Sequence, residues 1–104
     1  MKDQGKFAEN CYKLLKKVPS GRVTTYKAIA VALNTKAYRA VGQAMHNNPY
    51  APKVPCHRVV ASNGKMQGFA FGIKRKIKML KKEGIRIENG RVKDFETVLY
   101  KFNR

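Results

Sequence analysis

The sequence predicts a mainly α-helical fold with a small β-hairpin, and three observations support this prediction. Apolar residues recur at helical spacing in several stretches of the chain. Two short helical stretches are separated by only three residues, as in a helix-turn-helix. An Asn-Gly pair near the C-terminal end lies between alternating residues, which is typical of a tight hairpin. The length of 104 residues corresponds to a single domain, residues 1–104, with one core.

The first helix is predicted over residues 4–18, because Phe7, Leu14 and Val18 follow helical spacing. A Pro-Ser-Gly run then ends it. Cys11 lies on the same apolar stripe. Free cysteine packs like a small apolar side chain, so Cys11 is expected to be a core residue.

Two short helices are predicted next, over residues 26–33 and 37–46. Thr24 or Thr25 can cap the first of them, because a threonine hydroxyl accepts a hydrogen bond from the first turn. The brief break between the two helices predicts the helix-turn-helix.

The helix over residues 37–46 has two different faces on a helical wheel. The predicted core face holds Tyr38, Val41, Ala44 and Met45, and the other face holds Arg39, Gln43 and His46. The small residues Ala37, Ala40 and Gly42 flank Arg39 on the exposed side. Specific reading of the major groove uses several long polar side chains. This face is better suited to following a nucleic-acid backbone and inserting one arginine, although an ordinary exposed arginine is the alternative.

The C-terminal half is predicted from glycine spacing and apolar periodicity. Residues 61–72 contain several glycines and no clear period, so they are expected to form a flexible loop. Ile73, Ile77 and Leu80 mark a lysine-rich helix that ends at Gly84. The stretch "IRIENGRV" predicts the hairpin, and Phe95, Val98, Leu99 and Phe102 predict a final helical turn or two.

The charge balance points to a polyanionic partner. The chain has 23 Lys and Arg against 6 Asp and Glu, a formal net charge of +17. So large an excess of positive charges repels itself, and it is typical of a protein whose partner is nucleic acid. A lysine-rich protein with a merely solvated charged face is the alternative.

Other classes are disfavoured by the same sequence. No apolar run approaches the roughly 20 residues of a transmembrane helix, and the N-terminus does not resemble a signal sequence. Two cysteines without a secretory segment predict free thiols in a reducing compartment. We therefore expect a cytoplasmic protein, and with a nucleic-acid partner it would be nucleoid-associated or nuclear depending on the organism. The two Cys and two His have no metal-ligand spacing, so no metal is expected.

A stiff segment presents one of these thiols. The segment "NPYAPKVPCHRVV", residues 48–60, contains three of the chain's four prolines within a run of seven positions. In the same segment Cys56 directly precedes His57. A thiol needs a base or positive surroundings to become a good nucleophile. Neighbouring side chains diverge in both strands and helices, so transfer of a proton from Cys56 to His57 requires a water molecule or a turn.

Glu83 is the only acidic residue between positions 10 and 87. It lies near a predicted helix C-terminus, where the helix dipole disfavours a carboxylate. It is either neutralised by Lys81 and Lys82 or it orients His57, as the acid does in other relays of nucleophile, base and acid.

Several motifs resemble the O6-alkylguanine-DNA alkyltransferases. They are "VTTYKAIA" at 23–30, "YRAVGQAM" at 38–45, "NP" at 48–49 and "PCHRVV" at 55–60, followed by "GFAFG", "IKML" and "KKEG". The resemblance covers nearly all of residues 7–87. It implies a winged helix-turn-helix-like domain that binds the minor groove, rotates a damaged guanine out of the duplex and moves its O6-alkyl group irreversibly onto cysteine.

The resemblance also implies residue roles. Cys56 would accept the alkyl group, His57 would activate it through a water molecule, and Glu83 would orient His57. Tyr26 would aid rotation of the nucleotide and protonate the leaving guanine, and Asn48 would brace the active-site segment.

The remaining implied roles concern DNA and the substrate. Arg39 would fill the gap in the base stack, and the groove-contacting set would be completed by Thr25, Ala37, Ala40, Gly42 and Gln43. The substrate pocket would hold Met45, Arg58, Val59, Phe69 and Ala70, with the backbone of Cys56 and Val59 accepting from the guanine amine. The resemblance implies a monomer that acts on double-stranded DNA containing O6-alkylguanine, without a cofactor.

Three departures from the family pattern bear on these expectations. Usual members carry an additional N-terminal domain, so this chain is expected to be a minimal form or to work with a separate partner polypeptide. Phe69, Ala70 and Phe71 stand where many members have tyrosine, serine and glycine, which affects substrate range. Tyr38 and Gln43 stand where smaller residues are common, so groove contacts are expected to differ in detail.

Two alternative functions remain open. Alkyltransferase-like proteins bind alkylated guanine and flag it for excision repair without transfer, but they replace the acceptor cysteine, usually with tryptophan. Cys56 therefore favours the enzyme. A general DNA-coating protein would instead bind through charge alone and ignore Cys56.

Overall fold

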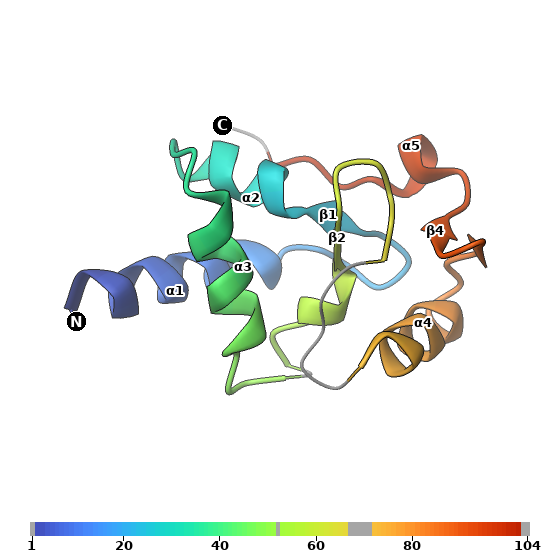
Figure 1. Ribbon diagram of the computed structural model, residues 1–104, viewed down its shortest axis with the longest axis horizontal. Helices are drawn as coiled ribbons and strands as arrows, with labels where there is room; N and C mark the ends of the chain where they lie inside the picture. The colour runs from blue at the N-terminus through green and yellow to red at the C-terminus, as the bar shows by residue number, and fades with distance from the viewer. Residues whose placement is uncertain (1, 52, 67–71, 103–104) are drawn as a thin grey trace.

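The computed structural model describes residues 2–51, 53–66 and 72–102 (Figure 1). In chain order the elements are α1 (Lys2–Leu15), β1 (Thr24–Thr25), α2 (Tyr26–Ala32), α3 (Tyr38–His46), the 3-10 helix η1 (Cys56–Arg58), β2 (Val59–Val60), α4 (Ile73–Lys82), β3 (Ile87–Glu88), β4 (Arg91–Val92) and α5 (Phe95–Val98). The fold is therefore mainly helical with small β elements, as the sequence predicts. No helix in the described ranges is long and apolar enough to cross a membrane.

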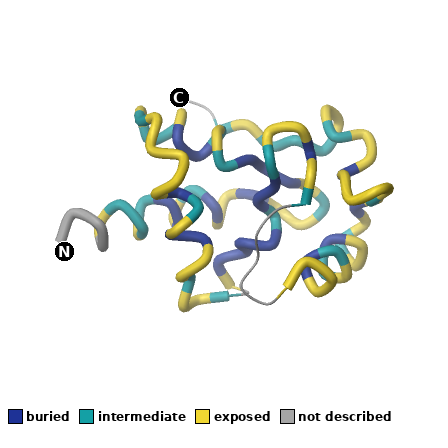
Figure 2. Tube along the Cα trace, viewed as in Figure 1, coloured by how far each residue is buried: buried dark blue, intermediate teal, exposed yellow. Residues whose placement is uncertain are grey.

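The helices α1, α2 and α3 pack around the larger of two apolar clusters. Cys11, Leu15 and Val18 of the predicted stripe are completely buried there, which confirms the prediction for Cys11. Tyr12 adds a polar tie, because its hydroxyl donates to the Ala44 carbonyl at 2.8 Å. Figure 2 shows this burial in the middle of the molecule, with exposed segments around it.

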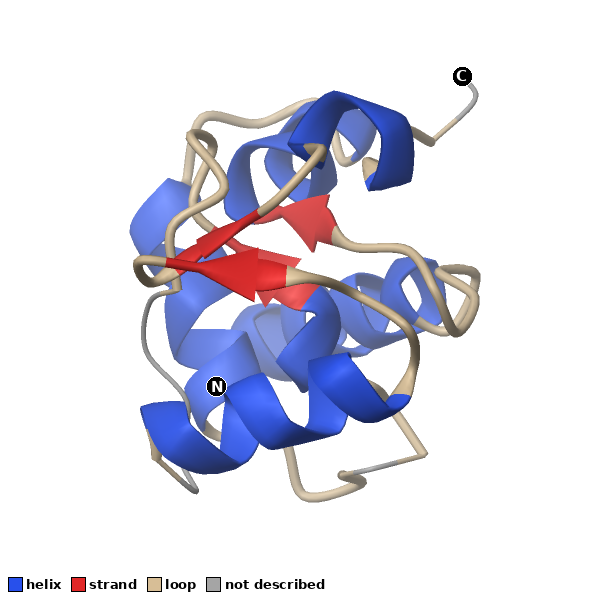
Figure 3. Cartoon of the chain, turned by 90° about the vertical axis from the view of Figure 1, so that its right-hand side faces the viewer, coloured by secondary structure: helices blue, strands red, loops and turns tan. Residues whose placement is uncertain are grey.

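A parallel ladder that the sequence does not predict joins the two halves of the chain. Thr24 pairs with Val59, and Thr25 pairs with Val60. The two strands lie between helices (Figure 3). Because β1 leads directly into Tyr26 of α2 and β2 directly follows η1, this ladder places Tyr26 and Cys56 beside each other.

The cap of α2 agrees with prediction. The Thr25 hydroxyl accepts from the Ala28 backbone N–H at 2.9 Å, so Thr25 satisfies one of the free donors of the first turn. Thr25 itself is buried between the ladder and the helix.

The C-terminal half forms a second, smaller apolar cluster. It consists of Val23, Val60, Leu80, Ile85 and Val92. The predicted hairpin is confirmed, because Ile87 pairs with Val92 and Glu88 with Arg91. Asn89 and Gly90 have φ angles of 54° and 75°, which are the left-handed values that a two-residue hairpin turn requires.

One part of the predicted core face of α3 is wrong. Val41, Ala44 and Met45 are buried, but the Tyr38 side chain is 44 % exposed. The helix begins at Tyr38, so this residue lies at the open end of the element rather than between its neighbours. On the other face Arg39, Gln43 and His46 are exposed, as predicted.

Candidate active site

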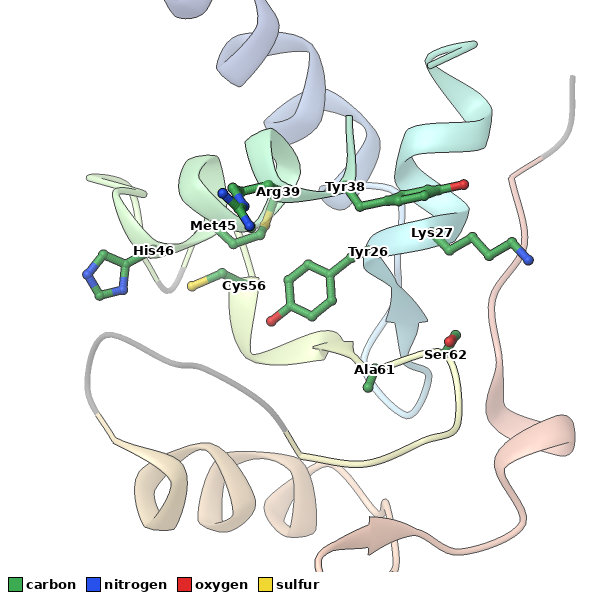
Figure 4. A pocket seen from close by; sticks show the side chains of 10 residues that line it. Tyr26, Lys27, Tyr38, Arg39, Met45, His46, Cys56, Ala61 and Ser62 are labelled. Atoms are coloured by element: carbon green, nitrogen blue, oxygen red, sulfur yellow. The ribbon is translucent and has the colours of Figure 1, made fainter. Parts of the chain in front are cut away.

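A cavity of about 680 Å³ opens between α2, α3 and η1 (Figure 4). It is lined by Tyr26, Lys27, Tyr38, Arg39, Gly42, Met45, His46, Cys56, Ala61 and Ser62. Figure 4 shows the Cys56 sulfur and the Tyr26 hydroxyl pointing into the same space. Such a volume accommodates a small organic group such as a nucleobase.

The backbone around Cys56 is held by short local bonds. The Cys56 N–H donates to the Val54 carbonyl at 2.8 Å, and the Arg58 N–H donates to Pro55 at 2.9 Å. Asn48 braces the same segment, since its amide donates to the Val54 carbonyl at 2.8 Å and accepts from Tyr50 N–H at 2.9 Å. Stiff backbone therefore fixes a thiol that is only 5 % exposed.

His57 follows Cys56 in η1 and binds Glu83. The imidazole Nε2 lies 3.0 Å from Glu83 Oε2, and His57 is buried. Because a carboxylate only accepts, Nε2 carries the proton in this pair, and Nδ1 is left as the acceptor. Burial lowers the pKa of His57 and outweighs the opposing effect of Glu83, so the ring is neutral at pH 7 and can accept a proton.

Glu83 is clamped on its other side by Arg58. The guanidinium donates through Nε to Oε1 at 2.9 Å and through Nη2 to Oε2 at 2.6 Å. Its Nη1 donates to the Val18 carbonyl at 2.7 Å. Burial alone would raise the pKa of Glu83, but hydrogen bonds from Arg58 and then His57 hold it below its ordinary value.

The contacts of Glu83 distinguish the two roles that the sequence allows for it, which are neutralisation by Lys81 and Lys82 or orientation of His57. It caps the C-terminus of α4, where the helix dipole disfavours a carboxylate. Its partners are Arg58 and His57, and none of the ion pairs found among the described residues joins it to Lys81 or Lys82. The carboxylate therefore belongs to the site and is not simply neutralised by its neighbours.

Tyr26 is a weak acid in this environment. Burial first, and then the proximity of Cys56, raises the pKa of Tyr26 to about 12. The phenol is thus a proton donor at neutral pH, and it lines the cavity from the first turn of α2.

Lys76 is a further charged residue near Cys56, and the sequence analysis did not identify it as part of the site. It is completely buried on the inner side of α4, and its Nζ donates to the Val59 carbonyl at 2.5 Å. Burial lowers the pKa of Lys76 to about 8, while the proximity of Cys56 acts in the opposite direction. The signal in the sequence was a lysine on the apolar stripe of Ile73, Ile77 and Leu80.

The predicted groove-contacting residues lie on α3 and at the start of α2. Arg39 and Gly42 line the cavity, whereas Ala37, Ala40 and Gln43 are exposed outside it. A Cβ at Gly42 would meet no heavy atom within 4 Å, so the surface above this residue is open. Thr25 is buried in the cap of α2 instead.

The predicted substrate-pocket residues are distributed differently. Met45 lines the cavity, whereas Val59 is buried beneath it in β2 and Arg58 is turned to Glu83. Phe69 and Ala70 lie outside the described residues, as does Phe71. Residues of the lining that sequence reasoning did not select are Lys27, Tyr38, His46, Ala61 and Ser62. Within the described part of the chain no group of three metal-ligating side chains gathers.

Comparison with known proteins shows the family to which the chain is similar. Residues 6–85 match the family model described as "6-O-methylguanine DNA methyltransferase, DNA binding domain". The chain is 42 % identical over 93 residues to a bifunctional methyltransferase/endonuclease of Picrophilus torridus, covering 88 % of this chain and 30 % of that protein. It is 46 % identical over 78 residues to a methylated-DNA–protein-cysteine methyltransferase of Methanosarcina barkeri, covering 74 % and 49 % respectively.

Solved structures of two proteins illustrate the similarity of the fold. The structure of Schizosaccharomyces pombe Atl1 in complex with damaged DNA containing O6-carboxymethylguanine has a TM-score of 0.81 and 29 % identity, covering 93 % of this chain and 96 % of that chain. The O6-methylguanine-DNA methyltransferase of Pyrococcus kodakaraensis has a TM-score of 0.70 and 48 % identity, covering 76 % and 46 %. The chain thus spans half or less of the length of the curated relatives named above. By its family match and these identities, the chain belongs to the O6-methylguanine-DNA methyltransferase family.

Proposed function

We propose that the protein repairs O6-alkylguanine in duplex DNA by transferring the alkyl group to the sulfur of Cys56. The observation that carries this proposal is a thiol facing a base-sized cavity, next in the chain to a neutral His57 that is held by Glu83. The net charge of +17 suits a DNA partner.

The chemistry follows from the roles that the site allows. The sulfur–carbon bond forms as the bond between the alkyl carbon and guanine O6 breaks. The thiol proton leaves to His57 through a water molecule, and Tyr26 donates a proton to the departing guanine, so one proton is lost and one is gained. The product is a thioether, which does not revert, so each protein molecule acts once.

The target base has to leave the stack to reach Cys56. Unstacking a base costs a few kcal/mol, and an inserted side chain that fills the gap offsets this cost. Arg39 lies at the cavity on α3, and Ala37 and Ala40 leave the backbone of the same helix accessible to a groove. These positions support entry from the minor groove.

A second candidate function is lesion binding without transfer. It is favoured by the similarity to Atl1, which extends over 96 % of that chain. In this case the cavity would hold the alkylated base, and the Cys56 sulfur would stay unmodified.

The proposal is tested by intact-mass analysis. Incubation with a duplex that contains one O6-methylguanine is expected to add one methyl group to the peptide bearing Cys56. The Cys56→Ser variant is expected to bind the lesion but gain no mass, because an alcohol is a far weaker nucleophile than a thiolate.

Three outcomes separate the candidates. Tight lesion binding with unchanged mass of the wild type would support the second function. Equal affinity for damaged and undamaged duplex, again with unchanged mass, would leave only binding through charge. Methylation at Cys11 in place of Cys56 would contradict the assigned acceptor.

A further inference from the structure

The outer face of α4 carries a row of exposed lysines. It consists of Lys74, Lys78, Lys81 and Lys82, here called the outer lysine row. At 100° per residue these four positions lie within an arc of about 100° on the helix surface. Lys76, Leu80 and Glu83 occupy the opposite side, where they contact the core and η1.

The outer lysine row has no compensating charge within the described residues. None of the ion pairs found there includes any of the four lysines. The nearest carboxylate in sequence, Glu83, is bound to Arg58 and His57 on the inner side of α4. Like charges four residues apart, as at Lys74, Lys78 and Lys82, destabilise a helix. The row therefore weakens α4 while it is unoccupied.

The neighbouring hairpin shows that this lack of compensation is local. Arg86 is paired with Asp94 at 2.9 Å, and Lys93 is paired with Glu88 at 3.6 Å. Arg86 and Lys93 thus have carboxylate partners, whereas the ion pairs of the described residues include no lysine of the row. This contrast indicates a surface whose counter-charge comes from another molecule.

The burial of α4 disfavours a membrane as that molecule. A helix that binds at a lipid surface inserts a whole apolar face, but Leu80 on the apolar side of α4 is completely buried, and Ile73, at the first position of the helix, is 39 % exposed. Successive lysines at Lys74, Lys78 and Lys82 are spaced by about 6 Å along the helix axis. A regular line of cations of this kind matches the regular charges of a nucleic-acid backbone.

The row also faces away from the cavity. Glu83 and Lys76 hold η1 and β2 from the inner side of α4, so the opposite side points away from Cys56. Figure 4 shows α3 and α4 on opposite sides of Cys56. The outer lysine row and α3 therefore lie on different sides of the molecule.

We propose that the outer lysine row is a second phosphate-binding surface, which holds another segment of double-stranded DNA while α3 and the cavity engage the first. This surface goes beyond the proposed alkyl transfer, because it needs neither the lesion nor Cys56. It would let one protein molecule contact two stretches of DNA at once and pass from one to the other.

The test compares two triple variants that each remove three positive charges. One is Lys74→Gln, Lys78→Gln and Lys82→Gln on α4. The matched control is Lys13→Gln, Lys16→Gln and Lys17→Gln at the end of α1, where all three lysines are also exposed. Protein bound to an immobilised duplex containing O6-methylguanine is offered a fluorescent, undamaged duplex as the second segment.

The α4 variant is expected to capture the second duplex at least tenfold more weakly than the wild type. Its plot of log K for that duplex against log salt should lose about 2.7 units of slope, at about 0.9 per phosphate contact. The α1 variant should keep the capture. The melting temperature of the α4 variant should stay unchanged or rise, because the repulsion along the helix is relieved.

Three outcomes would overturn this proposal. They are unchanged capture by the α4 variant, an equal loss in the α1 variant, and tighter capture of single-stranded RNA than of duplex DNA. The same salt plots on undamaged duplex in solution do not depend on the lesion. Failure of alkyl transfer is therefore distinguishable from failure of the second surface.

Discussion

At the scale of single residues, the site depends on how one carboxylate is shared. Glu83 holds His57 and Arg58 together, and Arg58 also reaches Val18 at the end of the first helical segment. These three side chains connect the reactive turn to α4 and to the segment after α1. Removing the carboxylate therefore affects orientation of the base and stability together.

The Glu83→Gln variant separates these two effects. It is expected to lower the rate of alkyl transfer about 100-fold, because His57 loses the partner that fixes its tautomer. It should lower the free energy of unfolding by about 1–3 kcal/mol, since charge-assisted hydrogen bonds to Arg58 are weakened. Single-turnover kinetics and urea unfolding measure the two quantities.

The control is Glu88→Gln, which removes an exposed carboxylate from the pair with Lys93. Surface pairs contribute about 0–1 kcal/mol, so this variant should retain the rate and nearly all of the stability. Equal losses in the two variants would contradict the role assigned to Glu83.

Lys76 predicts a pH dependence of stability. Its pKa is lowered from 10.5 to about 8 in the folded protein. Between these values the unfolded chain binds more protons than the folded one, so stability rises with pH in that window. Relative to Lys76→Met, the wild type should gain about 2–3 kcal/mol between pH 8 and pH 10.5.

The comparison uses denaturant unfolding of both proteins across this pH range. Burial also raises the pKa of Cys11 to about 11 and of Tyr26 to about 12. These groups lower stability as pH rises, but they are common to both proteins and cancel in the difference. A constant difference from pH 7 to pH 10.5 would show that folding does not lower the pKa of Lys76.

At the scale of the elements, α3 has one side that packs on the core and another side that is proposed to bind DNA. The buried side chains of Val41, Ala44 and Met45 pack the helix on the core. Ala37 and Ala40 are exposed and have small side chains, so they protrude little from the outer side of the helix. An element built in this way tolerates larger side chains on its outer side without unfolding. The proposed contact of this side with a DNA groove would not tolerate them.

The Ala40→Leu variant tests this difference. Leucine is also a good helix former, and Ala40 is exposed, so the free energy of unfolding should change by less than about 0.5 kcal/mol. Binding to duplex should weaken about tenfold or more, since the longer side chain holds the helix away from the groove. Fluorescence anisotropy with lesion-containing duplex gives the affinity.

Transfer from the free base O6-benzylguanine is the control for Ala40→Leu. Ala40 is not among the residues that line the cavity, so this reaction should proceed at the rate of the wild type. If duplex binding is unchanged, the outer side of α3 is not the surface that meets DNA.

The elements also show where sequence reasoning succeeds. Helices with an apolar stripe, the Thr25 cap and the Asn89-Gly90 turn are local features, so spacing and residue type predict them. The ladder of β1 and β2 is only two residues long on each side. A strand this short has no measurable period, and its partner is distant in the chain, so sequence reasoning missed it.

The candidate site was partly predictable for the same physical reason. Scarcity of acids singled out Glu83 as a partner for His57, and the two lie 3.0 Å apart. The bond from Arg58 to Glu83 spans 25 residues, and no spacing rule predicts a contact at that separation. The prediction that Tyr38 lies on the core face was wrong, because helical periodicity gives the face of a residue but not how far the core extends along the helix.

At the scale of the whole molecule, one small fold carries a cavity on one side and a cationic outer surface. The apolar clusters lie in the middle, the cavity opens between α2, α3 and η1, and the cations are spread over the outside. With a net charge of +17, self-repulsion acts against the compact state. The packed centre and the bonds between Arg58 and Glu83 have to offset it.

Cys56 and Met45 belong both to the larger apolar cluster and to the cavity wall. The proposed substrate cavity is thus lined in part by side chains that also stabilise the fold. Anyone who enlarges it by directed evolution, to admit bulkier adducts, removes packing atoms with each trimmed side chain. Heat tolerance should fall as adduct range widens, unless compensating substitutions are introduced far from the cavity.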